Sequence, residues 1–268
     1  MKLLLTSGGI SNKSIEDELK KLLNKDNFNG VKLLFCTTAS NYEGYNMSDW
    51  LVDDLIYLKN NGFEIDICDI NGISIDKLLP RFEWADVYFF EGGNTQWLKK
   101  GIEKSGLEAK LLNLLKRKVW IGVSAGSTVV CPTISDPVND LYDEDIEGYP
   151  KEGLNFVDFQ VMPHLNNSCF PKINIENIMN ASKKINEIDR KRIFVLEESS
   201  SASSNPGIDA PSGMDLIKVS KEDLNKLDDG VEYNEHKVNL LLRSLARNES
   251  TTASDLKLFI VKYKSTFL

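Results

Sequence analysis

The sequence predicts an α/β protein with a mostly parallel central sheet flanked by helices. Short apolar runs alternate with amphipathic stretches along the chain, which is the pattern of a parallel sheet built from βα units. Residues 87–90 and 119–121 are almost wholly apolar, as expected of strands that are buried on both faces. With 268 residues, 41% of them hydrophobic, the chain is long enough to bury a sizeable core.

The first half of the chain supplies the strands of the predicted sheet and two well-marked helices. Ser14 precedes an acidic turn and an apolar stripe at helical spacing, so we expect it to cap the first helix. Ser48 is expected to cap a second helix over residues 49–61, and Gly62 is suited to end that helix in a left-handed conformation. The predicted strands are residues 3–6, 32–37, 63–69, 87–90 and 119–123.

The second half of the chain is more polar and more irregular. An acidic segment, residues 136–152, is expected to be a solvated loop. Residues 220–268 keep apolar residues at helical spacing and are predicted to form a C-terminal appendage docked on a main domain of residues 1–219. The spacing of apolar residues over 255–264 does not distinguish a helix from a strand, so both are kept as expectations. The further predicted elements are strands at 156–162, 192–196 and 214–219 and a helix at 172–184.

The composition excludes several classes of protein. A formal net charge of −8 without a basic cluster argues against nucleic-acid binding. Apolar stretches are too short for a membrane span, and the N-terminus lacks the pattern of a signal peptide. The four cysteines are widely spaced, which favours neither a zinc site nor a disulfide framework. We therefore expect a cytoplasmic protein that uses no metal or organic cofactor.

A candidate nucleophile, Ser124, lies within the sequence Gly122-Val123-Ser124-Ala125-Gly126. This Gly-x-Ser-x-Gly pattern directly follows an apolar strand and precedes a segment compatible with a helix. A serine on a sharp strand-to-helix turn crowds the backbone on both sides, so small residues two positions before and after it are sterically required. The context therefore favours a nucleophile elbow over an ordinary turn.

A serine hydroxyl needs a base, and histidine has the pKa best suited to accept its proton at neutral pH. The chain has two histidines. His164 follows a predicted strand, at the sheet edge where the functional groups of parallel sheets meet. His236 lies in the polar tail. Position in the fold therefore favours His164 as the base.

The base in turn needs an acceptor, usually a carboxylate, that orients its far nitrogen. Glu197 and Glu198 follow the predicted strand at 192–196. Because neighbouring residues of a strand point to opposite faces, we expect only one of them to reach the site. Asp140, in the acidic segment, is a competing acceptor. The residues by themselves leave this choice open.

Backbone amides near the serine form a candidate oxyanion hole for the negatively charged tetrahedral intermediate. The N–H of Ala125 directly follows the nucleophile at the start of a helix. A second donor is expected from the glycine pair that follows the strand at 87–90, with Gly93 as the candidate. This glycine pair does not fit the Gly-x-Gly-x-x-Gly pattern of dinucleotide sites.

Four short motifs follow one another along the chain: Gly92-Gly93-Asn94-Thr95, Gly122-Val123-Ser124-Ala125-Gly126-Ser127, Cys131-Pro132-Thr133-Ile134 and Pro163-His164. Their order and spacing resemble the peptidase E (aspartyl dipeptidase) family of serine peptidases, related to cyanophycinase, over about residues 1–220. The resemblance implies a fold like that of class I glutamine amidotransferases, with Ser124 as nucleophile and His164 as base. The family's glutamate falls best on Glu198, and a family Asn-Asp pair makes Asp140 a secondary site candidate.

Substrate recognition departs from the family pattern. Peptidase E carries an arginine after its Pro-His that recognises the N-terminal aspartate of the substrate, whereas residues 170–182 contain no arginine here. Lys172 can supply a point charge but lacks the bidentate fork of arginine. We therefore predict Asn94, Asp140 and Lys172 as substrate-binding residues without assigning aspartyl specificity.

The predicted activity is hydrolysis of dipeptides or short peptides through an acyl-enzyme, by a monomer or homodimer with no nucleic-acid or membrane partner. Two alternatives remain. An α/β-hydrolase esterase places its acid between serine and histidine, which requires His236 with an acid such as Asp189 or Asp209. A catalytically silent binding protein is the other alternative, because fold does not fix function.

Overall fold

The structure is a computed structural model that describes residues 1–44, 49–135, 141–144, 146–182, 193–197, 201–204 and 258–261. The strands are β1 (Lys2–Thr6), β2 (Lys32–Cys36), β3 (Glu64–Cys68), β4 (Val87–Phe90), β5 (Val119–Val123), β6 (Gln160–Met162), β7 (Ile193–Leu196), β8 (Ser201–Ser204) and β9 (Leu258–Val261). The helices are α1 (Lys13–Leu23), α2 (Asp49–Asn60), α3 (Ile75–Trp84), α4 (Thr95–Lys104), α5 (Glu108–Leu114), α6 (Ala125–Thr128) and α8 (Ile175–Ser182), with a 3₁₀ turn, η1, at Ser40–Tyr42.

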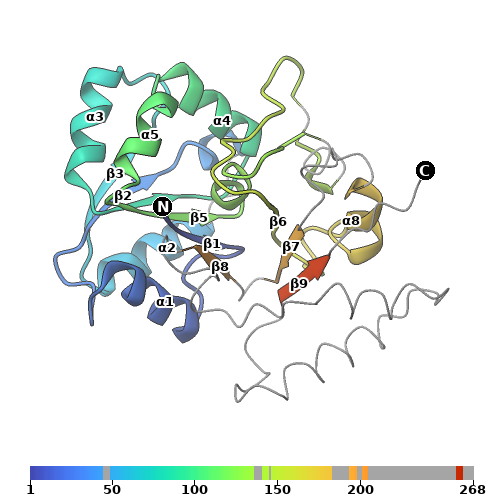
Figure 1. Cartoon of the computed structure of the whole chain (residues 1–268), viewed down its shortest axis with the longest axis horizontal. Coiled ribbons are helices and arrows are strands. Elements are labelled where there is room, and N and C mark those ends of the chain that lie inside the picture. Colours follow the sequence, from blue (N-terminus) through green and yellow to red (C-terminus); the bar gives the residue numbers. More distant parts are fainter. Residues whose placement is uncertain are drawn as a thin grey trace.

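These strands form two sheets (Figure 1). The larger sheet has six strands in the order β3-β2-β4-β5-β1-β8, and every pairing in it is parallel except that of β1 with β8. The smaller sheet has the order β6-β7-β9, with β6 and β7 parallel and β7 and β9 antiparallel. The predicted α/β fold with a mostly parallel sheet is confirmed. None of the described helices combines the length and the apolar character needed to cross a membrane.

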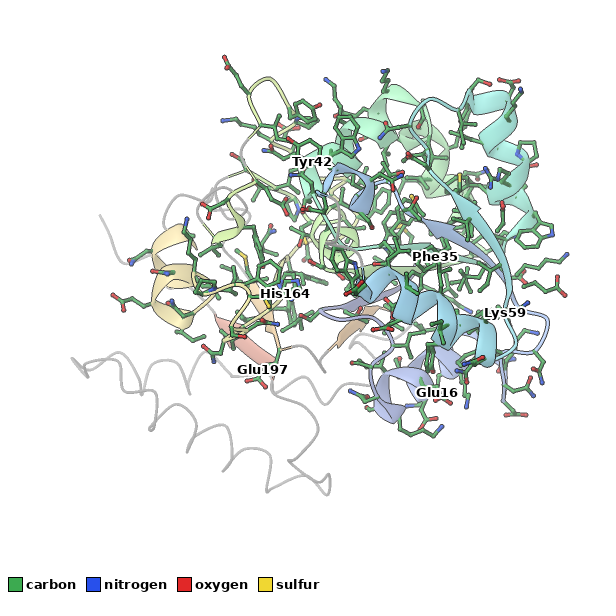
Figure 2. All side chains as sticks on the ribbon, turned by 180° about the vertical axis from the view of Figure 1, so that it is seen from behind. Glu16, Phe35, Tyr42, Lys59, His164 and Glu197 are labelled. Atoms are coloured by element: carbon green, nitrogen blue, oxygen red, sulfur yellow. The ribbon has the colours of Figure 1, made fainter. Side chains whose placement is uncertain are left out.

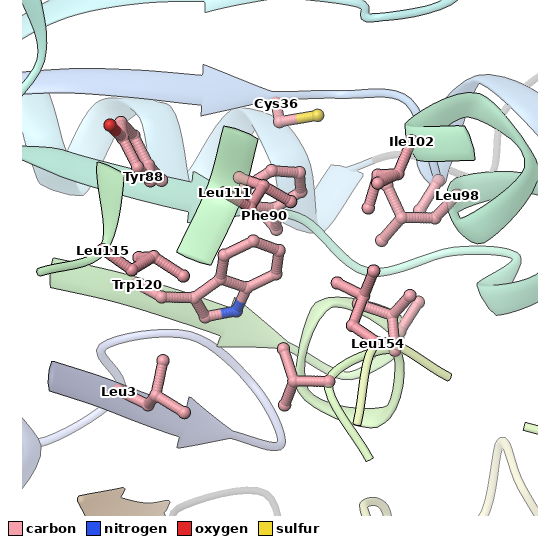
Figure 3. Packing of buried hydrophobic residues seen from close by; sticks show 14 of the residues in the cluster. Leu3, Cys36, Tyr88, Phe90, Leu98, Ile102, Leu111, Leu115, Trp120 and Leu154 are labelled. Atoms are coloured by element: carbon pink, nitrogen blue, oxygen red, sulfur yellow. The ribbon is translucent and has the colours of Figure 1, made fainter. Parts of the chain in front are cut away.

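The larger sheet is covered on both faces, and alternate residues of its strands enter two separate cores. Helices α3, α4 and α5 cover one face and α1 and α2 cover the other (Figure 1). On the first face Trp120 stacks on Phe90 with ring centroids 3.8 Å apart, within a cluster that also contains Leu98 and Leu111 of the helices (Figure 3). Burial on both faces explains why these strands are almost continuously apolar.

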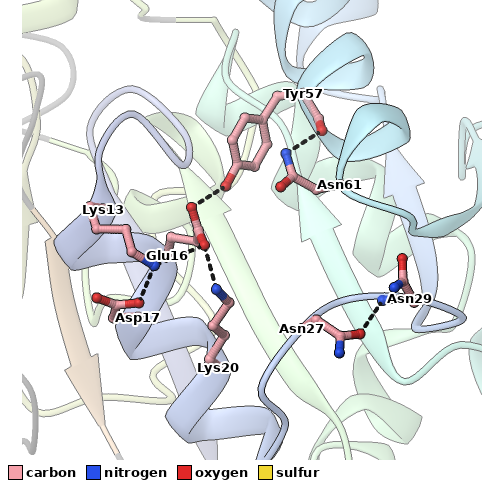
Figure 4. A network of polar contacts seen from close by, with 8 residues as sticks. All are labelled: Lys13, Glu16, Asp17, Lys20, Asn27, Asn29, Tyr57 and Asn61. Atoms are coloured by element: carbon pink, nitrogen blue, oxygen red, sulfur yellow. Dashed lines mark hydrogen bonds and ion pairs between the residues drawn. The ribbon is translucent and has the colours of Figure 1, made fainter.

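On the second face, a polar network connects α1 to α2. Glu16 accepts hydrogen bonds from Lys20 Nζ at 2.5 Å and from the hydroxyl of Tyr57 at 3.4 Å (Figure 4). Helix α1 begins after Asn12, whose side chain accepts the N–H of Ile15 at 3.0 Å. The expectation that Ser14 caps the helix was wrong, because the side-chain oxygen of Asn12, whose backbone is extended, caps it two residues earlier and Ser14 lies inside the helix. The other expected cap, Ser48, lies outside the described residues.

Several predicted bounds shift in the second half of the chain. The strand expected at 156–162 is confined to β6, because residues 153–156 bond to the loop that follows α6; Phe156 N–H, for example, donates to Val130 O at 2.9 Å. The helix expected at 172–184 begins at Ile175, since Asn174 Oδ1 accepts the N–H of Asn177. The strand expected at 214–219 lies outside the described residues. Within the predicted appendage the structure describes β9. Residues 255–264, for which the sequence left helix or strand open, therefore contain a strand.

Candidate active site

Ser124 lies on a strained turn between β5 and α6. Its backbone has φ 46° and ψ −105°, a conformation that L residues rarely adopt. A Cβ atom on Gly122 would stand 2.3 Å from Gly126 O, and one on Gly126 would stand 2.1 Å from Phe90 O. Both glycines are therefore sterically required, as the sequence pattern predicted.

Hydrogen bonds from neighbouring elements fix this turn in place. Ser127 Oγ donates toward the carbonyl oxygens of Gly122 and Thr6, at 2.7 and 2.8 Å. The N–H of Ser124 donates to Thr6 O at 3.0 Å, and the indole N–H of Trp120 donates to Gly126 O at 3.1 Å. Strand β1 and the core below β5 thus determine where the Ser124 hydroxyl points.

The structure brings His164 into contact with Ser124. His164 follows β6, is 7% exposed, and places Nε2 2.7 Å from Ser124 Oγ. Its ring stacks on Phe170 with centroids 4.1 Å apart and an interplanar angle of 11°. The distance is that of a hydrogen bond, which is the geometry that a serine nucleophile and its base would need.

The sequence analysis missed Ser7, which contacts His164 from the end of β1. Ser7 is fully buried, and its Oγ accepts the backbone N–H of His164 at 2.9 Å and lies 3.3 Å from Nδ1. This hydroxyl therefore helps to orient the imidazole from the side opposite Ser124. Its position directly after a central strand is the signal that could have revealed it, because such strand ends form the sites of parallel sheets.

The predicted carboxylate partners of His164 are only partly within the described chain. Glu198 and Asp140 lie outside the described residues. Glu197 is half-buried at the end of β7, and Figure 2 shows both it and His164 on the side of the molecule that carries the smaller sheet. The N–H of Leu165 donates to Leu196 O at 2.9 Å. The segment that leads to the two glutamates thus passes beside the His164 loop.

Two backbone amides next to Ser124 are available to bind an anion. A Cβ atom on Gly92 would lie 3.3 Å from Ser124 Cβ, so the glycine turn touches the nucleophile. Gly93 has φ +123°, and a Cβ there would collide with Ala39 O at 2.4 Å. Within the described chain, neither Gly93 N–H nor Ala125 N–H donates a hydrogen bond. These are the two amides that the sequence nominated as oxyanion donors.

The predicted substrate-binding residues have structural partners. Asn94 is 4% exposed, and its side-chain oxygen caps α4 by accepting the N–H of Trp97 at 2.8 Å. Lys172 forms an exposed ion pair with Asp143. The carbonyl of Asn94 and the charge of Lys172 are therefore both engaged within the protein.

Two residues of the acidic segment, Tyr142 and Glu144, pack against the site, so the expectation of a solvated loop was wrong for them, whereas Asp143, Glu147 and Glu152 are exposed as expected. Glu144 Oε2 accepts the N–H of Thr95 at 2.8 Å, at the start of α4, where backbone N–H groups lack helical partners. Burial raises the pKa of Glu144 to about 8, although hydrogen bonding with Thr95 by itself lowers the pKa. The hydroxyl of Tyr142 donates to Pro163 O at 2.8 Å, next to His164.

Comparison with known sequences relates the chain to peptidases. The model of peptidase family S51 matches residues 3–201. An uncharacterized peptidase of Listeria monocytogenes is 26% identical over 157 residues, which cover 56% of this chain and 73% of the relative. Peptidase E of Escherichia coli is 37% identical over 101 residues, which cover 37% of this chain and 43% of that relative.

Two solved structures have the same fold. A candidate peptidase E protein from Listeria monocytogenes has a TM-score of 0.63 at 21% identity, with 77% of this chain and 95% of the other covered. A peptidase from an acI-B1 actinobacterium has a TM-score of 0.58 at 15% identity, with 78% and 84% covered.

Proposed function

Because the chain belongs to peptidase family S51, and so to a family of serine-type peptidases, we propose that it hydrolyses dipeptides or short peptides through an acyl-enzyme on Ser124. The observation that carries the proposal is the 2.7 Å contact between Ser124 Oγ and His164 Nε2 on a strained elbow. Both side chains are held from several elements, so the pair is already arranged for proton transfer.

The reaction follows from these positions. Ser124 Oγ attacks the carbonyl carbon of the peptide bond while its proton passes to His164 Nε2. The amides of Gly93 and Ala125 stabilise the resulting oxyanion. When the C–N bond breaks, His164 gives the proton to the leaving amine. His164 then deprotonates a water molecule that attacks the acyl ester, and Ser124 is released as the free hydroxyl.

The orientation of His164 requires its Nδ1 atom to carry a proton when Nε2 accepts one from Ser124. Ser7 Oγ lies 3.3 Å from Nδ1 and can accept a hydrogen bond from the protonated Nδ1. We assign Glu198 as the carboxylate that completes the triad, because the Leu165–Leu196 bond brings the chain preceding it beside His164. A carboxylate there would stabilise the imidazolium that forms during each proton transfer.

The Ser124–His164 contact favours this mechanism over an esterase that uses His236. For substrates, the ion pair of Lys172 with Asp143 weakens the case for aspartyl specificity, because the lysine charge is already compensated. We therefore propose short peptides in general, with Asp140 and Asn94 near the bound substrate.

Two experiments test the proposal. One is labelling with a fluorophosphonate, and the other is a screen of a dipeptide library that includes Asp-X members. We expect the parent protein to be labelled and to cleave members of the library, with kcat falling by about 10⁶-fold in Ser124→Ala. His164→Ala should lose both signals, whereas His236→Ala should keep them. Ser105→Ala, at the far end of α4, is a matched control. A folded parent protein that neither reacts with the label nor cleaves any peptide would support the silent binding protein.

A further inference from the structure

Two carboxyl groups meet directly behind the glycine turn of the site. Glu91 follows β4 and is fully buried, and its Oε2 atom accepts the N–H of Gly92 at 2.8 Å. The other oxygen, Oε1, is also buried, and no donor within the described residues reaches it. A buried carboxylate oxygen without a donor is costly, because it loses its hydration and gains nothing in return.

The second carboxyl group belongs to Asp54 of α2. Its side chain lies close enough to that of Glu91 for the two to interact, and it occupies the space beside Gly9, where a Cβ atom would lie 2.5 Å from Oδ1. Two ionised carboxylates cannot bond to each other, because both only accept. A proton on one of the pair would turn their repulsion into a hydrogen bond.

The electrostatics of the pair agree with this chemistry. Burial, followed by the charge of Asp54, raises the pKa of Glu91 well above its usual range. Burial raises the pKa of Asp54 to about 6. The charged and titratable groups of α2 that face the pair, Asp53 and Tyr57, supply no cation, and the indole N–H of Trp50 adds only a weaker stabilisation of the Glu91 carboxylate.

We propose that Glu91 carries this proton on Oε1 and donates it to Asp54, and that the pair positions the Gly92-Gly93 turn so that Gly93 N–H points at the oxyanion. In this arrangement the protonated oxygen donates to Asp54, and the carbonyl-like Oε2 accepts from Gly92. Both residues are positioning residues, since neither is required to touch the substrate. The inference rests on the proposed function of Gly93 as an oxyanion donor.

The remaining contacts of the turn show why the pair matters. Ser40 Oγ donates to Gly92 O at 2.9 Å, and the N–H of Asn94 donates to Ala39 O at 3.1 Å. The turn is thus fixed on both sides of Gly93, whose own N–H donates to no acceptor within the described residues. Loss of the shared proton at alkaline pH would place two negative charges in contact in a buried position. Their repulsion would move Glu91 and break its hydrogen bond with Gly92 N–H.

Three variants separate this role from a purely structural one. Glu91→Ala removes the acceptor for Gly92 N–H, and we expect kcat to fall up to about 100-fold, the lower end for loss of an oxyanion donor. Glu91→Gln keeps both contacts, because its carbonyl accepts from Gly92 and its amide donates to Asp54. It should restore most of the lost kcat, and its activity should not show the alkaline decline of the parent protein. Glu64→Gln, the same change at an exposed glutamate of β3, should leave the parent pH profile unaltered.

Infrared difference spectroscopy gives a measurement that does not depend on activity. The parent protein at neutral pH should show a C=O band of a buried carboxylic acid that Glu91→Gln removes and Glu64→Gln retains. Because Glu144 also has a raised pKa, Glu144→Gln is recorded as well, and it should leave the Glu91 band in place. The inference is overturned if the parent is active and either this band is missing or the pH profiles of parent and Glu91→Gln coincide. Inactivity of the parent with the band present would instead refute the proposed function, and leave the shared proton established. Glu91→Gln keeps the test valid if Glu91→Ala does not fold.

Discussion

Replacing Ser7 with alanine tests how much the orientation of His164 contributes to the reaction. The variant removes the acceptor of the His164 backbone N–H and the contact with Nδ1, at 2.9 and 3.3 Å. Leaving the buried N–H without a partner should lower the free energy of unfolding by about 1–3 kcal/mol. Loss of the Nδ1 contact, a hydrogen bond worth about 0.5–1.5 kcal/mol, should lower kcat by about two- to tenfold.

Thr38→Val is the matched control for Ser7→Ala. Thr38 is also fully buried after a central strand, and its hydroxyl accepts the N–H of Ile70 at 2.9 Å. Urea titration should therefore show a similar loss of stability in both variants, while steady-state kinetics should show a lower kcat only in Ser7→Ala. If both variants lose stability equally and both keep the parent kcat, Ser7 is a structural residue and the reasoning about the imidazole is refuted.

Two further changes test the elbow and the acidic segment. Gly126→Ala places a Cβ atom 2.1 Å from Phe90 O, so the free energy of unfolding measured by thermal unfolding should fall by about 1–3 kcal/mol, the range for overpacking. Labelling of Ser124 should also be reduced. Gly44→Ala, which adds its methyl group in open space, should change neither property. Burial raises the pKa of Glu144 in the folded state to about 8, above its unfolded value. Between these two pKa values the folded state binds one proton more than the unfolded state. The free energy of unfolding should therefore fall as pH rises from about 4 to about 8. Glu144→Gln should flatten that decline in urea titrations, and an unchanged slope would show that the carboxyl group is not buried in solution.

The sequence predicted those parts of the site whose chemistry is local. Ser124 could be found because the elbow constrains residues only two positions away, and the collisions at Gly122 and Gly126 show that constraint in atomic terms. His164 could be found because the chain offers two histidines and one of them follows a strand. The strands at 87–90 and 119–123 were predicted to the residue, since burial on both faces leaves a continuous apolar run.

The parts that could not be predicted depend on contacts between distant segments. Ser7 and His164 are separated by 157 positions, and although the strand before Ser7 indicates that it lies at the site edge, it does not indicate that the hydroxyl meets an imidazole. The Asp54–Glu91 pair likewise joins a helix to the end of a strand, and each residue taken alone resembles an ordinary acidic side chain. Glu144 was assigned to solvent because charge-rich segments usually are solvated, but its carboxyl group accepts a backbone N–H at the start of α4.

Strand order explains why these particular segments meet. Strands β4, β5 and β1 are adjacent in the larger sheet and parallel, so the residues that follow them lie at the same edge. Those residues are the Glu91-Gly92-Gly93 turn, the Ser124 elbow and Ser7. The smaller sheet then adds His164 from the end of β6. A sheet with β1 at any other position would separate Ser7 from Ser124, and the same sequence motifs would not form a site. The order of strands, which periodicity does not encode, is thus the step that brings the separate motifs together as the proposed nucleophile, base and amide donors.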